Sequence, residues 1–80
     1  MSGETQANRI LNLEGLLCPI PIVKISQAIK DIPINGIIEA TATDPGVLVD
    51  IPAWTRTTGN EVIKIERDGK LVRFSIRRLK

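Results

Sequence analysis

One cysteine and no histidine among 80 residues limit how this chain can be stabilised. A single cysteine cannot form an internal disulfide, and without histidine the chain lacks the usual imidazole metal ligand. The fold must therefore rest on a hydrophobic core, and a chain of this length is too short for two such cores. Its apolar content of 42%, with 25% charged residues of both signs, is that of a folded protein. We predict one domain over residues 9–80 after a polar, disordered tail at residues 1–8.

The first half of the chain changes from strand to helix periodicity and back again. Residues 10–13 form an extended run that ends before Gly15, and residues 37–43 alternate as a second strand. Between them, apolar side chains recur at the spacing of one helix face: Ile22, Ile25, Ile29 and Ile32. This pattern predicts an amphipathic helix that connects the two strands.

The second half combines a helix that contains a proline with a hairpin. Asp44-Pro45 opens a helical stretch, and Pro52 within it indicates either a kink or a fresh helix capped by Asp50, which we favour. Gly59-Asn60 ends the stretch.

Residues 62–67 and 70–79 then alternate as two strands, joined by Asp68-Gly69 as a two-residue turn. On the inner face, Ile63 and Ile65 should oppose the apolar side chains of the return strand: Val72, Phe74 and Ile76. The predicted order is βαβαββ.

Both predicted helices have one apolar face, and crossovers between parallel strands are right-handed in nearly all proteins. Both helices should therefore cover the same face of one four-stranded mixed sheet. We predict an α/β (α+β) fold, a two-layer α/β sandwich, whose other sheet face is free to meet a partner.

The segment between the first strand and the first helix carries the cysteine, followed by two prolines. Pro19 and Pro21 suit a first helical turn, where backbone N–H groups have no helical acceptor. Cys18 would then be the N-cap, with its sulfur accepting a hydrogen bond from the N–H of Ile20. The helix dipole there would lower the pKa of the thiol from about 8.5, giving more reactive thiolate at neutral pH.

Cys18 could also have a purely structural role, because a lone cysteine is often a small buried hydrophobic residue. Serine, aspartate or asparagine would make a better cap, which favours a chemical role. The neighbouring Leu16, Leu17 and Ile20 would form an apolar rim that shields the sulfur and contacts another protein.

The chemistry open to this cysteine is narrow. The composition excludes a Cys-His pair, a Ser-His-Asp triad and a CxxC redox motif. A peroxide-reducing cycle within one chain needs a resolving thiol, whereas a sulfur carrier needs none. Such a carrier takes sulfur from a donor persulfide and yields it to a second nucleophile, as in thiol–disulfide exchange. We expect a stoichiometric carrier with sulfurtransferase half-reactions, and neither cofactor nor metal.

Residues 13–21 contain a Cys-Pro-x-Pro motif that resembles the signature of the TusA/SirA-like sulfur carrier family. The likeness continues through Asp44-Pro45, residues 50–54 and residues 59–61, and so covers nearly all of residues 9–80. The resemblance implies a fold like the C-terminal domain of bacterial initiation factor three.

In this family the motif cysteine accepts persulfide sulfur, which implies that Cys18 is the catalytic residue, supported by Pro19, Ile20 and Pro21. Some relatives carry a second cysteine where this chain has Thr55, so that cysteine's role is not carried over.

The resemblance also implies partners. The donor would be a cysteine desulfurase or rhodanese, and the acceptor a DsrE-like protein or a tRNA thiolation component. The sulfur would serve 2-thiouridine in tRNA, cofactor thiolation or sulfur oxidation. We expect a monomer in isolation, with no direct nucleic-acid contact and no membrane span, in a reducing cytoplasm.

Four charged residues are candidates to line the approach to Cys18, although solvated surface charge is the default explanation: Lys24, Asp44, Asp50 and Arg56. Trp54 is expected in the core.

Two alternatives remain open. A regulatory or nucleic-acid-binding module is suggested by basic residues near the C-terminus: Lys70, Arg73, Arg77, Arg78 and Lys80. With Trp54 and Phe74 as the only aromatics and a net charge of +2, the chain has no stacking platform and little attraction for phosphate. The second alternative is a subunit that assists a membrane sulfur or selenium system.

Overall fold

In a computed structural model of the chain, residues 7–80 are described. They form strand β1 (Arg9–Leu13), helix α1 (Ile20–Ala28) with the single 3₁₀ turn η1 (Ile29–Asp31), strand β2 (Ile37–Ala42), helix α2 (Val47–Thr58), and strands β3 (Glu61–Asp68) and β4 (Leu71–Arg77). This succession confirms the predicted βαβαββ order.

The predicted tail at residues 1–8 falls mostly outside the described residues. Asn8, which the sequence places in that tail, is tied to the start of β2. Its N–H donates to the carbonyl of Ile37 at 2.8 Å, and its Oδ1 accepts from the N–H of Ile37 at 2.9 Å.

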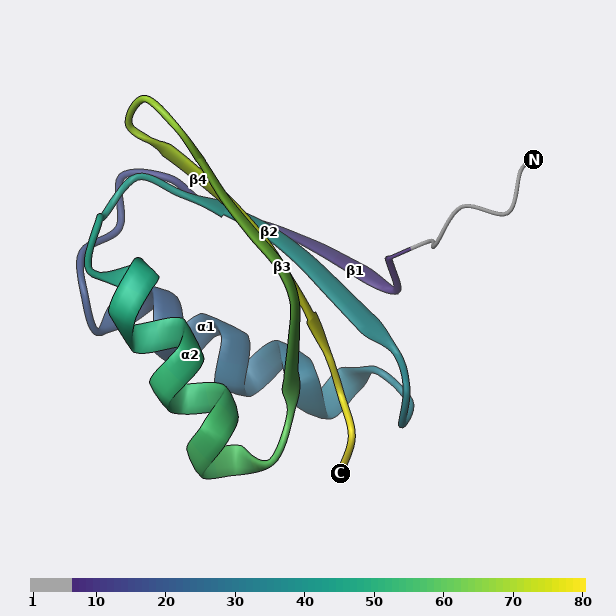
Figure 1. The fold of residues 1–80 in the computed structure, drawn as a ribbon. Helices are drawn as coiled ribbons and strands as arrows, with labels where there is room; N and C mark the ends of the chain where they lie inside the picture. Colours follow the sequence, from purple (N-terminus) through teal and green to yellow (C-terminus); the bar gives the residue numbers. More distant parts are fainter. Residues whose placement is uncertain (1–6) are drawn as a thin grey trace.

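The strands form one four-stranded mixed sheet in the order β1-β2-β4-β3. β1 and β2 are parallel, and β4 runs antiparallel to both β2 and β3. Both helices lie on the same side of the sheet (Figure 1). The predicted two-layer sandwich is therefore confirmed.

A single cluster of buried apolar side chains lies between the helices and the sheet. The inner sheet face supplies residues at alternate strand positions, such as Ala40 and Phe74, which are register partners on β2 and β4. The helices supply residues at helical spacing: Ile25 and Ala28 from α1, and Val47 and Ile51 from α2. This cluster fixes the helices against the sheet. Trp54, expected in the core, is only partly buried at its edge.

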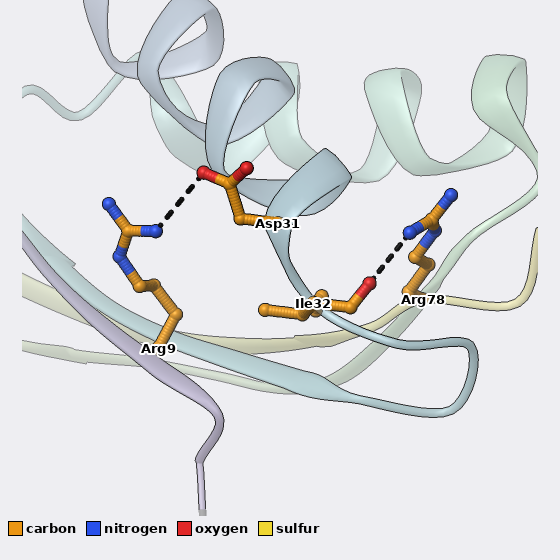
Figure 2. Close-up of polar contacts among 4 residues, drawn as sticks. All are labelled: Arg9, Asp31, Ile32 and Arg78. Carbon is orange, nitrogen blue, oxygen red and sulfur yellow. Dashed lines mark hydrogen bonds and ion pairs between the residues drawn. The ribbon is translucent and has the colours of Figure 1, made fainter.

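The end of the first helical segment is held by contacts from both ends of the chain (Figure 2). The Arg9 guanidinium of β1 lies 3.3 Å from the carboxylate of Asp31 in η1. Arg78, which follows β4, donates from Nη1 to the carbonyl of Ile32 at 2.6 Å. Both contacts tie the crossover segment to the strands.

The hairpin differs from its prediction at two points. Asp68 pairs with Leu71, so the two-residue turn is Gly69-Lys70 and not Asp68-Gly69. Gly69 has a φ of +62°, which glycine adopts at the first position of a hairpin turn without strain. A register shift between Val62 and Lys64 adds one residue to β3, so Ile63 is exposed and Val62 takes its inward place.

Helix α2 is continuous from Val47 to Thr58 with Pro52 inside it, so the prediction of a fresh helix capped by Asp50 is wrong. The Asp50 N–H donates to the carbonyl of Gly46 at 2.9 Å and therefore belongs to the first helical turn. Gly59 ends the helix as predicted, with a φ of +80° and its N–H donating to the Thr55 carbonyl at 2.9 Å.

The outer sheet face is not covered by a helix (Figure 1). It carries mostly polar side chains around a hollow of about 250 Å³, including Glu39, Thr41, Lys64, Glu66 and Arg73. The predicted open face thus combines charged side chains with the exposed Ile10. No helix within residues 7–80 is long and apolar enough to cross a membrane.

Candidate functional site

The parallel pairing of β1 and β2 decides where the site lies. Leu13 and Ala42, the last residues of the two strands, are register partners, so the segments that follow them leave the sheet side by side. The Gly15 N–H donates to Thr43 Oγ1 at 2.9 Å and links these segments directly. Cys18 lies on the segment after β1. Asp44 lies on the segment after β2, and Asp50 lies in the helix α2 that follows it. The chain topology therefore brings the cysteine and the two carboxylates together.

Cys18 is exposed on the loop between β1 and α1. The helix begins at Ile20, with Pro19 at the N-cap position and Pro21 in the first turn. The Ile20 N–H donates to the carbonyl of Leu17 at 2.9 Å. The prediction that Cys18 caps the helix and accepts from Ile20 is therefore wrong, because a turn before the helix already uses that N–H. The placement of the two prolines at the helix start is confirmed.

Two carboxylates hold Cys18 instead. Its sulfur donates a hydrogen bond to Asp50 Oδ2 at 2.7 Å, and its backbone N–H donates to Asp44 Oδ2 at 2.7 Å. Asp50 reaches the sulfur from the first turn of α2. Asp44 lies in the connection between β2 and α2, and its other oxygen accepts the N–H of Gly46 at 3.1 Å.

This environment raises the pKa of the Cys18 thiol above its ordinary value. The hydrogen bond to Asp50 is the largest cause, followed by loss of solvation and by the negative charges of Asp50 and Asp44. The predicted lowering of this pKa is wrong, because the sulfur is bonded to the Asp50 carboxylate and feels the charge of Asp44, whereas the Ile20 N–H is bonded to Leu17. The hydrogen bond to Asp50 therefore favours the protonated form of the sulfur.

The pKa of Asp44 shifts in the opposite direction to that of the thiol. Hydrogen bonds from the N–H groups of Gly46 and Cys18 stabilise its carboxylate and lower its pKa, against a smaller opposing loss of solvation. The negative charge of Asp44 therefore fixes the backbone of the cysteine loop to the start of α2.

The sulfur lies beside exposed apolar side chains. In the predicted rim, Leu17 is 72% exposed and Ile20 is 44% exposed, whereas Leu16 is half-buried against the core. Val49, adjacent to Asp50 in α2, is 73% exposed and was not part of the predicted rim. Its place in the sequence, next to Asp50 and off the helix face of Val47 and Ile51, was the available signal for it. Exposed apolar side chains thus flank Cys18 and Asp50 in the sequence, and another protein can cover such side chains.

The remaining predicted residues lie apart from the sulfur. Lys24 lines a groove between β1 and α1 that also contains Arg9 and Asp31. Arg56 is six residues beyond Asp50, about 9 Å farther along the axis of α2. Of the four charged candidates, the structure brings Asp44 and Asp50 to Cys18.

Some of the basic residues near the C-terminus make contacts within the chain. Arg77 pairs with Glu61 at 3.4 Å, and Arg78 donates to a backbone carbonyl at the end of η1. Lys70 lies in the hairpin turn, and the Lys80 side chain packs close to Gly59. These internal contacts leave less free positive charge for a nucleic-acid-binding reading.

Within residues 7–80, no group of three or more histidine, cysteine, aspartate or glutamate side chains is placed to hold a metal ion. The site offers a sulfur nucleophile, two carboxylates and an apolar surround.

The fold and site define a small two-layer domain with one exposed cysteine before its first helix, and comparisons with known proteins identify the class. The profile described as sulfurtransferase TusA matches residues 9–78. The chain therefore belongs to the TusA family, whose members include sulfur carrier proteins.

Individual relatives agree with this assignment. YrkF of Bacillus subtilis, named as a candidate sulfur carrier protein, is 37% identical over 73 residues, which cover 91% of this chain and 40% of YrkF. The chain thus spans about two fifths of the length of that relative. The sulfur carrier protein TusA of Pseudomonas syringae is 30% identical over 69 residues, which cover 86% of this chain and 82% of that protein.

A solved structure extends the likeness to the fold. The crystal structure of a SirA-like protein from Desulfitobacterium hafniense matches with a TM-score of 0.76 and 15% identity, covering 90% of this chain and 99% of that one. At this identity, the match shows the fold alone.

Proposed function

We propose that the domain over residues 9–80 carries sulfur as a persulfide on Cys18 and relays it between partner proteins. The observation that supports this most directly is the placement of the chain's only cysteine. Cys18 is exposed on a loop held by Asp44 and Asp50, and it is bordered by exposed apolar side chains. Membership of a family of sulfur carriers supports the same reading.

Loading requires no net oxidation. The Cys18 thiolate attacks the outer sulfur of a donor persulfide, so a new sulfur–sulfur bond forms at Sγ while the donor's sulfur–sulfur bond breaks. The donor leaves as a thiolate and takes up the proton that Cys18 lost. Delivery repeats this exchange, with the acceptor's thiolate attacking the outer sulfur and Cys18 as the leaving group. One cysteine on the carrier is sufficient for both steps.

The partners are proposed from the resemblance to the sulfur carrier family. A cysteine desulfurase or a rhodanese would supply the sulfur, and a DsrE-like protein or a tRNA thiolation component would receive it. In this proposal the exchange takes place in a reducing cytoplasm, where thiols stay reduced. The apolar side chains around Cys18 would be covered in each complex, which keeps water from the persulfide during transfer.

Intact-protein mass spectrometry tests the loading step. The chain is incubated with a cysteine desulfurase and cysteine, or with polysulfide, or with thiosulfate and a rhodanese. We expect a mass increase of one sulfur atom that a reducing agent removes. Cys18→Ser should gain nothing under the same conditions, and absence of an adduct on the native chain from every donor would contradict the proposal.

The relay step needs a second measurement. Loaded carrier, freed of donor, is mixed with a candidate acceptor, and both masses are followed. Transfer is supported when the added sulfur leaves Cys18 and appears on an acceptor cysteine. If only one of the donors loads Cys18, its identity would also indicate the pathway. Thiosulfate would favour sulfur oxidation, and the desulfurase would favour tRNA or cofactor thiolation.

A further inference from the structure

In the hydrogen bond between Cys18 and Asp50 the sulfur is the donor, which does not suit a permanently activated nucleophile. Reactive cysteines usually lie beside positive charge or a free helix N-terminus, which stabilise the thiolate. Here the sulfur donates to Asp50 Oδ2 at 2.7 Å, and the nearest helical N–H, that of Ile20, is bonded to the carbonyl of Leu17. The site therefore favours the protonated sulfur.

We propose that Asp50 is a positioning residue that guards the unloaded carrier, keeping Cys18 as a hydrogen-bonded thiol until a docked partner changes the surroundings of that carboxylate. This inference rests on the proposed function, since it concerns the same sulfur. In this proposal, Asp50 determines when the sulfur can react. An exposed thiol would otherwise be open to oxidants and to any passing electrophile.

The position of Asp50 is well fixed. Its backbone belongs to the first turn of α2, where its N–H donates to the Gly46 carbonyl at 2.9 Å. The next residue, Ile51, is fully buried in the core. The carboxylate is therefore carried by a rigid element, and the cysteine loop is fastened to the same region through Asp44. Because both sides are anchored, the contact is a built feature of the fold.

The two charges that act on the sulfur act in one direction. Asp50 comes from α2 and Asp44 from the connection before it, and both negative charges raise the pKa of the thiol. The first turn of α1 presents Ile20 and Pro21, which are uncharged. On the loop itself, Glu14 accepts a hydrogen bond from Thr41 on β2 at 3.3 Å. Lys24 lies in the groove beside β1.

The rate of iodoacetamide alkylation of Cys18, measured against pH, tests the guard without needing a sulfur donor. Asp50→Asn keeps the size of the side chain and removes its charge. We expect its alkylation midpoint to lie at lower pH than that of the native chain, and its rate at neutral pH to be several-fold higher. Asp44→Asn should shift the midpoint in the same direction by less, because Asp44 acts on the sulfur only through its charge.

Two control variants separate charge from packing. Asp50→Glu keeps the negative charge and should retain a midpoint near that of the native chain. Asp68→Asn removes an exposed charge at the end of β3 and should leave the profile unchanged. The guard is overturned if Asp50→Asn shifts the midpoint no more than Asp68→Asn does, or if Asp50→Glu lowers it as far as Asp50→Asn.

A comparison within the native chain makes the test independent of variant folding. The alkylation midpoint of the folded chain must lie above that of the same chain in denaturant, and a midpoint at or below the unfolded value overturns the guard. The proposed carrier function fails separately, when the folded chain takes no sulfur from any donor. A chain that loads sulfur but shows no effect of Asp50 keeps its function and loses the guard.

Discussion

At the scale of single residues, Asp44 joins two parts of the backbone through one carboxylate. Its oxygens accept the N–H groups of Cys18 at 2.7 Å and Gly46 at 3.1 Å. These hydrogen bonds lower the pKa of Asp44 in the folded chain. A carboxyl group with a lowered folded pKa stabilises the fold above its unfolded pKa of about 3.9, and this contribution is lost as the pH falls through the folded value.

We therefore predict that the free energy of unfolding decreases as the pH falls from about 5 towards 2, and that Asp44→Asn weakens this decrease. The amide oxygen of asparagine can still accept one N–H, so the variant should fold. Denaturant unfolding at a series of pH values measures the effect, with Asp68→Asn as the control for loss of an exposed charge. An acid dependence in Asp44→Asn equal to that of the native chain would show that other carboxyl groups account for it.

The residues of the site also show where sequence reasoning succeeds and where it stops. Pro19 and Pro21 occupy the helix start as predicted, because the rule that places proline there depends only on local backbone geometry. The partner of the sulfur lies 32 residues away in the chain. Asp50 can be nominated from its charge, but the direction of the thiol pKa depends on which group reaches the sulfur, and tertiary packing decides that.

At the scale of elements, Pro52 is the main irregularity. It lies inside α2, where its ring lacks the N–H that a helix would direct to the carbonyl four residues earlier. The ring is half-buried, and Thr55 Oγ1 donates to the Pro52 carbonyl at 2.9 Å. Local rules favour a helix that begins afresh at such a proline, but burial of Val47 keeps the preceding turn helical.

We predict that Pro52→Ala raises the free energy of unfolding by about 2 kcal/mol. An added helical hydrogen bond and the loss of a steric clash outweigh the greater freedom of the unfolded chain. Denaturant unfolding measures the change, and Ala53→Gly, at an exposed position of the same helix, is a control expected to lower stability by about 1 kcal/mol. A destabilised Pro52→Ala would mean that packing of the ring contributes more than the missing hydrogen bond.

Strand β3 contains an irregularity that the sequence pattern does not predict. Its alternating pattern predicts the strand itself, and the turn after it is misplaced by one residue. The extra residue between Val62 and Lys64 reverses which side chains face inward on the early part of the strand. Periodicity alone does not reveal such a bulge, because Val62 and Ile63 are equally apolar.

At the scale of the molecule, the site depends on the parallel pairing of β1 and β2. The two segments that carry Cys18 and the carboxylates leave the same edge of the sheet, so the geometry of the site depends on the packing that holds both helices in place. Phe74 is central to that packing. It is 2% exposed on β4, opposite Ala40 on one side and Ile65 on the other.

Phe74→Ala should therefore affect the whole domain. Replacing a buried phenylalanine by alanine costs about 3–5 kcal/mol, and a chain of this size has a total stability of only about 4–12 kcal/mol. We predict a large loss of unfolding free energy, together with an alkylation midpoint of Cys18 that moves toward the unfolded value as the helices loosen. Val62→Ala, at a half-buried position on the edge strand, should cost about 1 kcal/mol and leave that midpoint in place. If Phe74→Ala lost no more stability than Val62→Ala, the core would not be the element that holds the site together.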